Sequence, residues 1–140
     1  MTELKTRPGR KSVRRFLESV GHPVRKSDSI RLLAMMEEAT GEKGVMWGDS
    51  IVGLGRYHYK NANGREADWM LTGFSPGKQN LVVYIMPGFS RNGDIPGALG
   101  KHRLGRSSLY MNKLDDVDFD ELRVLITASV EEMRRNYDCG

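Results

Sequence analysis

The feature that most constrains the fold of this chain is a set of three short segments with strand character, separated by turn signals. The segments are rich in β-branched and aromatic residues and cover 51–59, 67–74 and 79–86. Asn63-Gly64 favours a tight hairpin between the first two segments, and the turn 75–78 (Ser-Pro-Gly-Lys) separates the last two. Pro87 ends the third segment because proline cannot donate to a strand ladder. The pattern predicts an antiparallel β-meander.

Helical patterns precede this meander. Ser12 can cap a helix that ends near Val20, and Ser27 can cap a second helix over 28–40. Gly41 follows at the position where a left-handed residue commonly ends a helix. The N-terminal part of the chain is therefore predicted to supply two helices that pack on the sheet.

A long C-terminal helix follows a last predicted strand at 107–111. Asp118 and Glu121 have the spacing of a capping box, with Val117 and Leu122 as a hydrophobic staple. The apolar stripe of this helix consists of Leu122, Leu125, Ile126, Ser129, Val130 and Met133. The predicted fold class is α+β: an antiparallel β-sheet meander covered by N-terminal helices and a long C-terminal helix, as a two-layer sandwich.

Length and composition fit one globular domain. The chain has 140 residues, 29% charged and 39% hydrophobic, so we expect a single domain over 11–140 after a disordered basic leader at 1–10. Cys139 is the only cysteine, which agrees with a reducing cytoplasm. No apolar run approaches the roughly 20 residues of a membrane span, and the N-terminus has no secretory signal. A cytoplasmic protein without membrane contact is expected, as a monomer or as a homodimer paired through a sheet edge.

Charge is distributed unevenly along the chain, whose formal net charge is +4. Basic residues outnumber acidic ones within 1–31 and within 91–113, whereas acidic residues dominate 114–140. The basic N-terminus makes salt-dependent contact with nucleic acid one hypothesis for function, because phosphates attract Lys and Arg regardless of base sequence.

Four stretches in a fixed order resemble a known family. They are EATGEKGVMWGDSIVGLGRYHY (38–59), LTGFSPGKQNLVVYIMPGF (71–89), LGKHRLGRSSLYMNKLDDVDFDEL (99–122) and LITASVEEM (125–133). Over roughly residues 12–135 the chain is similar to the YdhG-like family of bacterial domains of unknown function. The resemblance implies the compact α+β sandwich of the frataxin-like and YjbR-like fold group. It implies no settled activity, although some members are described as frataxin-like iron chaperones.

An iron role directs attention to the acidic run before the last helix. Its candidate metal ligands are Asp115, Asp116, Asp118 and Asp120, since carboxylates suit hard cations and iron is the alternative cofactor; otherwise no cofactor is predicted. The same residues would also complete a helix cap and complement the helix dipole, which is the interpretation we favour. Arg14 and Arg15 on the first helix would repel ferrous iron.

A basic loop and an aromatic sheet together suggest an anion site. The predicted ligand-binding residues are Trp47, Tyr59, Lys78, Lys101, Arg103 and Arg106. Several donors in the glycine-spaced loop 100–108 suit phosphate or carboxylate. Aromatic residues favour strands in any sheet, but in basic surroundings they also form platforms on which bases stack. Gly48, Gly53 and Gly55 weaken a strand unless a helix or a ligand approaches it closely.

The sequence contains no recognisable catalytic arrangement. There is no G-x-S-x-G elbow, and His22, His58 and His102 have no helical metal-ligand spacing. The leading hypothesis is therefore a non-enzymatic binding domain for a small anionic ligand or a protein partner. The alternatives are a frataxin-like iron chaperone and nucleic-acid binding through the basic N-terminus.

Overall fold

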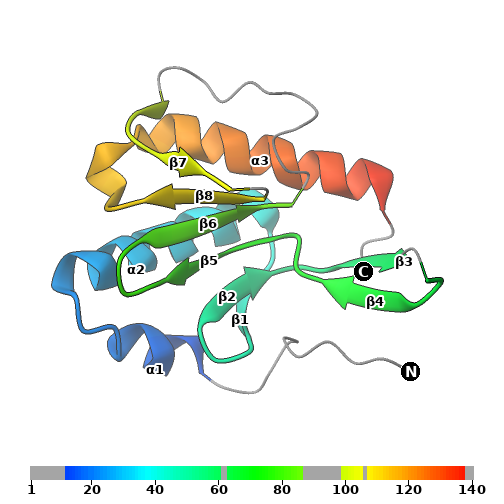
Figure 1. The fold of residues 1–140 in the computed structure, drawn as a ribbon, viewed down its shortest axis with the longest axis horizontal. Coiled ribbons are helices and arrows are strands. Elements are labelled where there is room, and N and C mark those ends of the chain that lie inside the picture. Colours follow the sequence, from blue (N-terminus) through cyan, green and yellow to red (C-terminus); the bar gives the residue numbers. More distant parts are fainter. Residues whose placement is uncertain (1–11, 61–62, 87–98, 106, 138–140) are drawn as a thin grey trace.

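The computed structural model describes residues 12–60, 63–86, 99–105 and 107–137 (Figure 1). The helices are α1 (Val13–Glu18), α2 (Pro23–Thr40) and α3 (Phe119–Asn136), with a 3-10 turn at Leu114–Asp116. The strands are β1 (Gly44–Trp47), β2 (Ile51–Leu54), β3 (Tyr57–Lys60), β4 (Glu66–Trp69), β5 (Thr72–Pro76), β6 (Leu81–Ile85), β7 (Arg103–Leu104) and β8 (Ser108–Met111). The predicted leader at 1–10 and most of the irregular stretch 88–106 lie outside the described residues.

Six strands form one antiparallel sheet in the order β1-β2-β5-β6-β8-β7. The predicted meander is confirmed in β2, β5 and β6, which are adjacent in the sheet and follow one another there in the order of the sequence. The predicted last strand is β8. The sequence did not predict the two edge strands β1 and β7, which are only four and two residues long. The α+β prediction is confirmed.

The central hairpin bends in its middle. β2 pairs with β5 in the main sheet, whereas β3 and β4 form a separate two-stranded ribbon that projects beyond it (Figure 1). One register runs through both ladders, since Leu54 pairs with Thr72 and Tyr57 with Trp69. Gly55, between the ladders, has a φ of 65°, which glycine adopts without steric cost. The single strands predicted at 51–59 and 67–74 are therefore each divided into two.

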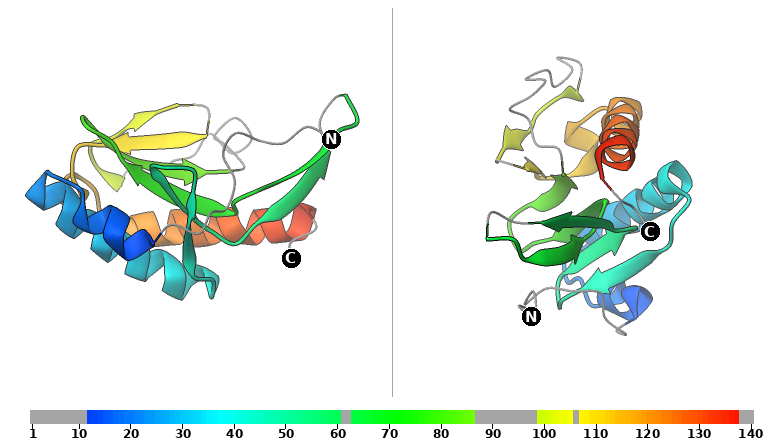
Figure 2. Two further views of the ribbon diagram at one scale, coloured as in Figure 1. Left: turned by 90° about the horizontal axis from the view of Figure 1, so that it is seen from below. Right: turned by 90° about the vertical axis from the view of Figure 1, so that its right-hand side faces the viewer.

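The three helices lie against one face of the six-stranded sheet (Figure 2). Buried strand residues that alternate along the chain face them: Met46, Val52, Leu54, Phe74, Leu81, Val83, Ile85, Leu109 and Met111. The predicted stripe of α3 is confirmed, because Leu122, Ile126, Ser129, Val130 and Met133 are buried and Leu125 packs partly buried against the core. The opposite face of the sheet has no helix over it among the described residues.

The predicted helix ends are largely confirmed. The Ser12 hydroxyl accepts from the Arg15 backbone N–H at 3.2 Å, and the Asp118 carboxylate accepts from the Glu121 N–H at 3.0 Å. Gly41 ends α2 with a φ of 73°. Polar side chains thus satisfy amide groups that have no partner inside a helix.

The predicted start of α2 was wrong. The helix begins at Pro23, and Nδ1 of His22 accepts from the Arg25 N–H at 3.2 Å, so Ser27 lies inside the helix instead of capping it. The buried side chains of the first two turns are all polar: Arg25, Asp28 and Ser29. Apolar periodicity therefore gave no sign of these turns, although proline at the first helical position is itself a start signal.

Candidate ligand-binding face

The face of the sheet opposite the helices is the candidate site. Strand alternation and register place on it Val45, Trp47, Ile51, Gly53, Gly73, Ser75, Val82, Tyr84, Ser108, Tyr110 and Arg103. None of these side chains is acidic, and Arg103 is the only ion among them. The described part of this face, which we call the open face, is therefore positively charged.

The glycines of the open face are covered by side chains of the sheet itself. A Cβ on Gly53 would lie 2.6 Å from Nε1 of Trp47, and a Cβ on Gly53 or Gly73 would lie 2.8 Å from the Met70 sulfur. Trp47 and Met70 are 1% and 0% exposed, and Trp69 packs edge-on against Trp47 with ring centroids 5.4 Å apart. An indole and a thioether therefore occupy the space that the two glycines create. At Gly53, the sequence had predicted that a helix or a ligand would approach.

The remaining part of the open face presents two tyrosine rings and a guanidinium. Tyr110 is in register with Arg103, whose guanidinium carbon lies 5.0 Å from the ring centroid. Tyr84 on the adjacent strand is a diagonal neighbour of Tyr110, because it pairs with Ser108. Burial raises the pKa of the Tyr84 hydroxyl, and the neighbouring Tyr110 raises it further. Both rings are half-buried, whereas Arg103 is exposed.

The structure separates the predicted apolar wall from the predicted charges. Trp47 is on the edge strand β1 and Arg103 is on the edge strand β7, so the two residues are five strand spacings apart. At about 4.8 Å per spacing this is roughly 24 Å. Tyr59 is on the ribbon, with its ring centroid 5.6 Å from that of Tyr57. These residues do not converge on one small ligand.

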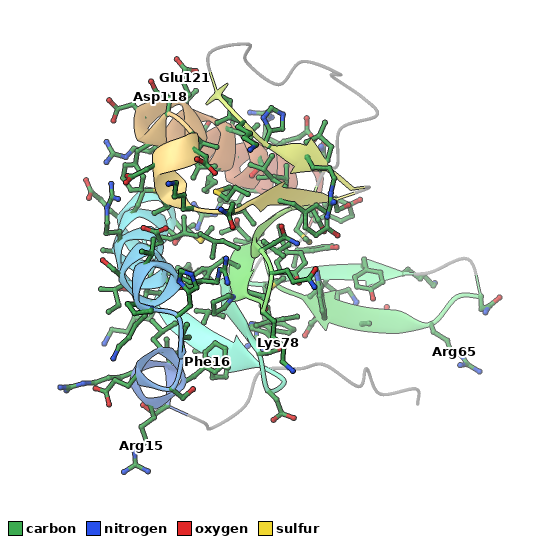
Figure 3. The ribbon with its side chains drawn as sticks, turned by 60° about the vertical axis from the view of Figure 1, so that its left-hand side comes forward. Arg15, Phe16, Arg65, Lys78, Asp118 and Glu121 are labelled. Carbon is green, nitrogen blue, oxygen red and sulfur yellow. The ribbon has the colours of Figure 1, made fainter. Side chains whose placement is uncertain are left out.

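The predicted lysines add little to a common site. Lys78 occupies the turn between β5 and β6 (Figure 3). Lys101 has an exposed side chain two residues before Arg103, and its backbone N–H donates to the carbonyl of Asp116 at 2.9 Å. Arg106 lies outside the described residues. Of the predicted set, Trp47 and Arg103 lie on the open face, at its opposite edges, and Lys101 is two residues from Arg103.

The acidic run has structural roles in this fold. The Asp118 carboxylate caps the start of α3 (Figure 3). Asp115 lies 3.9 Å from the guanidinium of Arg31, and Asp120 lies 3.9 Å from that of Arg123. Among the described residues, no three His, Cys, Asp or Glu side chains are grouped so that they could hold a metal ion. The arrangement supports the capping interpretation of these carboxylates.

A buried charged residue that the sequence analysis did not single out fastens the sheet to α2. The guanidinium of Arg25, which is 4% exposed, donates to the carbonyls of Gly77, Lys78, Gln79 and Asn112 and to Oδ1 of Asn112, at 2.9–3.4 Å. One turn further on, the Asp28 carboxylate accepts from the Leu114 N–H at 2.9 Å. Arg25 and Asp28 thus hold the β5–β6 turn and the end of β8 against the helix. The sequence feature that could have indicated these roles is a basic and an acidic residue one helical turn apart, just before the apolar residues of the predicted second helix.

The ribbon carries the two most clearly perturbed groups outside the open face. Burial raises the pKa of Tyr57 to about 12, with Tyr137 adding to the effect at a ring distance of 4.9 Å. Nδ1 of His58 lies 2.9 Å from the Asp68 carboxylate and Nε2 lies 3.5 Å from that of Glu66. Hydrogen bonding to these two carboxylates, Asp68 first, raises the pKa of His58.

An apolar groove lies on the helix side of the molecule, between α1, α2 and β1. It has a volume of about 430 Å³ and is lined by Val13, Arg14, Leu17, Glu18, Ile30, Leu33, Glu37 and Gly44. Its arginine is paired with Glu18 at 3.2 Å, and the Glu37 carboxylate accepts from the Gly44 N–H at 3.0 Å. Because this arginine is already paired with a carboxylate, the groove is a poorer binding site for an anion than the open face.

Comparison with known proteins gives no relative: no family model, no curated protein and no solved structure matches the chain. The YdhG-like resemblance stays a prediction from the motifs. Within the described segments, none of the helices has the length and apolar character that crossing a membrane requires.

Proposed function

We propose that this chain is a non-enzymatic binding domain that holds an anionic ligand or partner on the open face, at Tyr84, Tyr110 and Arg103. The observation that carries the proposal is that the guanidinium of Arg103 lies 5.0 Å from the Tyr110 ring centroid. The described side chains of the open face include no carboxylate. An anion there meets a cation and a hydroxyl-bearing aromatic surface.

The chemistry of these groups suits binding. Arginine presents a planar fork of donors that matches carboxylate or phosphate, and it keeps its charge at all relevant pH values. The hydroxyl of Tyr84 is protonated at neutral pH, as any tyrosine hydroxyl is, and burial raises its pKa further, so it is able to donate a hydrogen bond. Ser108, in register with Tyr84, brings another hydroxyl. Lys101 adds positive potential at the edge, which attracts anions over a distance of about a Debye length.

The same groups are poor candidates for catalysis. Activating a nucleophile needs an adjacent base, and the described side chains of the open face include no histidine, carboxylate or cysteine. This composition favours a binding role for the open face over a hydrolytic one.

Native mass spectrometry of the full chain, purified without chelators, tests the proposal. We expect a phosphate-bearing or carboxylate-bearing adduct that is lost in Arg103→Gln and kept in Arg123→Gln. Arg123 is a matched control, because its guanidinium also lies over a ring, 5.7 Å from the centroid of Phe119, on α3 away from the open face. Equal retention of the adduct by both variants would overturn the proposal. A metal adduct that depends on Asp115 and Asp116 would favour the iron-chaperone alternative.

A further inference from the structure

The shape of the open face bears on which kind of anion it takes. Tyr84 and Tyr110 are diagonal neighbours on two adjacent strands, and Arg103 follows on the next strand. The aromatic and cationic groups are thus spread over a sheet surface that none of the described helices covers, in contrast to the convergent groups of an enclosed pocket for a small ion. Such a surface fits an extended ligand that offers flat rings and negative charges in alternation.

We infer that the occupant of the open face is a single-stranded nucleic acid, bound with its bases on Tyr84 and Tyr110 and its phosphates at Arg103. This inference rests on the proposed function and names the class of anion. Base–aromatic stacking tolerates any base sequence, because every base has a π-face, and a sheet with aromatics on adjacent strands is a known solution to single-strand recognition. The guanidinium over Tyr110 extends the stacking surface, because arginine also stacks on bases.

Charge complementarity supports this occupant. The described open face carries Arg103 and no acid, and Lys101 stands exposed beside it. A polyphosphate backbone releases counterions when it meets such a surface, which makes affinity salt-dependent. A neutral ligand gains nothing from the charge of the guanidinium, a cationic ligand is repelled by it, and an aliphatic anion uses the guanidinium but offers no ring to stack on the tyrosines.

The extent of the surface sets the size of the bound segment. On the β1 side, Trp47 and Met70 already fill the space over Gly53 and Gly73. Among the described residues, the partly exposed rings of the open face therefore lie on β6 and β8, with Arg103 beyond them on β7. We expect about two to three bases to be in contact, as in other sheets that present two or three aromatics.

A single strand is expected to bind better than a duplex. In a duplex the bases stack on one another, so their faces are not available to tyrosine rings. Duplex DNA of the same sequence should contact Arg103 and Lys101 through phosphate alone. Preference for the single strand therefore separates stacking from simple charge attraction.

Fluorescence anisotropy with a labelled 12-nucleotide oligothymidylate and the full chain tests the inference. Stacking contributes about 1–3 kcal/mol per base, so we expect Tyr84→Leu and Tyr110→Leu to weaken binding by about 5-fold to 150-fold each. Tyr84→Phe and Tyr110→Phe keep the ring and should retain affinity within about 3-fold, which assigns the loss to the ring and not to the hydroxyl. Tyr59→Leu, on the ribbon, is the matched control and should bind as the unaltered chain does.

The salt dependence supplies a second readout. Arg103→Gln should reduce the slope of log affinity against log salt by about 0.7, the value for one phosphate contact with a single strand. Arg123→Gln should leave the slope unchanged. Binding that is indifferent to Tyr84, Tyr110 and Arg103 would overturn the inference and locate the contact elsewhere, for example on the basic segment 1–10.

The remaining outcomes separate this inference from the proposed function. If the oligonucleotide fails to bind but thymidine monophosphate or inorganic phosphate binds in an Arg103-dependent way, the inference is overturned and the proposed function stands. Equal affinity for the duplex would also overturn it. If none of these probes binds, and the purified chain carries no anion, both are overturned.

Discussion

Replacing Arg25 with methionine should cost this fold about 3 kcal/mol of its free energy of unfolding. Arg25→Met keeps the aliphatic stem and removes a guanidinium that donates to five acceptors on the β5–β6 turn and Asn112, at 2.9–3.4 Å. Hydrogen bonds to a charged group contribute about 1.5–3 kcal/mol each, but only the bond to Lys78 is as short as 2.9 Å.

The expected loss in the free energy of unfolding is therefore smaller than the sum of five full hydrogen bonds. The acceptors lie at a partly buried turn that water can reach once the guanidinium is gone, and removing a buried charge also relieves its desolvation penalty. About 3 kcal/mol remains, which is a large part of the 5–15 kcal/mol that stabilises a typical domain.

Urea unfolding followed by tryptophan fluorescence measures the change. With a slope of about 2 kcal/mol per M, the midpoint should fall by about 1.5 M. Arg14→Met is the matched control, because Arg14 is 89% exposed and pairs with Glu18 at the surface, so its loss should change stability by less than about 0.5 kcal/mol. Equal midpoints for the two variants would refute the reasoning that the buried guanidinium holds the turn to α2.

Three further outcomes follow from the packing and the pKa shifts. Gly53→Ala should destabilise the fold by about 1–3 kcal/mol in the same urea assay, because the new methyl group collides with a buried indole, whereas Gly21→Ala meets no atom within 4 Å and should not. The pKa of His58 is raised from 6.5 and should fall in Asp68→Asn, which an NMR titration of the imidazole measures. The stabilising contribution of the protonated imidazole is present below about pH 6.5 and is lost as pH rises through the folded pKa. The pKa of Tyr57 is raised from 10.0 to about 12, so stability should fall as pH rises from about 10 towards 12, and Tyr57→Phe should reduce that slope; identical slopes would contradict the assignment.

Local chemistry allowed several elements to be predicted from the sequence. The caps at Ser12 and Asp118 and the glycine end at Gly41 depend on a few neighbouring residues, and they were found where expected. The stripe of α3 was equally readable, because apolar residues recur at helical spacing. The start of α2 was missed since its buried side chains, among them Arg25 and Asp28, are polar and follow no apolar period.

The candidate site was predicted only in part. Arg103 was singled out from the basic loop, whereas Tyr84 was not among the predicted ligand-binding residues. Tyr110 was part of a predicted strand, but its place beside both became visible only through the register of β6, β7 and β8. Trp47 was expected to line the same ligand, yet it belongs to the opposite edge and packs within the sheet.

The sequence by itself determined the three helices, the central strands of the sheet, most of the helix ends, and that the fold is α+β. These properties depend on residues within a few positions of one another. The tertiary structure decided that the central hairpin bends at Gly55, that Trp47 and Met70 fill the space over the sheet glycines, and that Arg103 meets Tyr110. Each of these depends on strand order and register, which are set by long-range packing that no local pattern encodes.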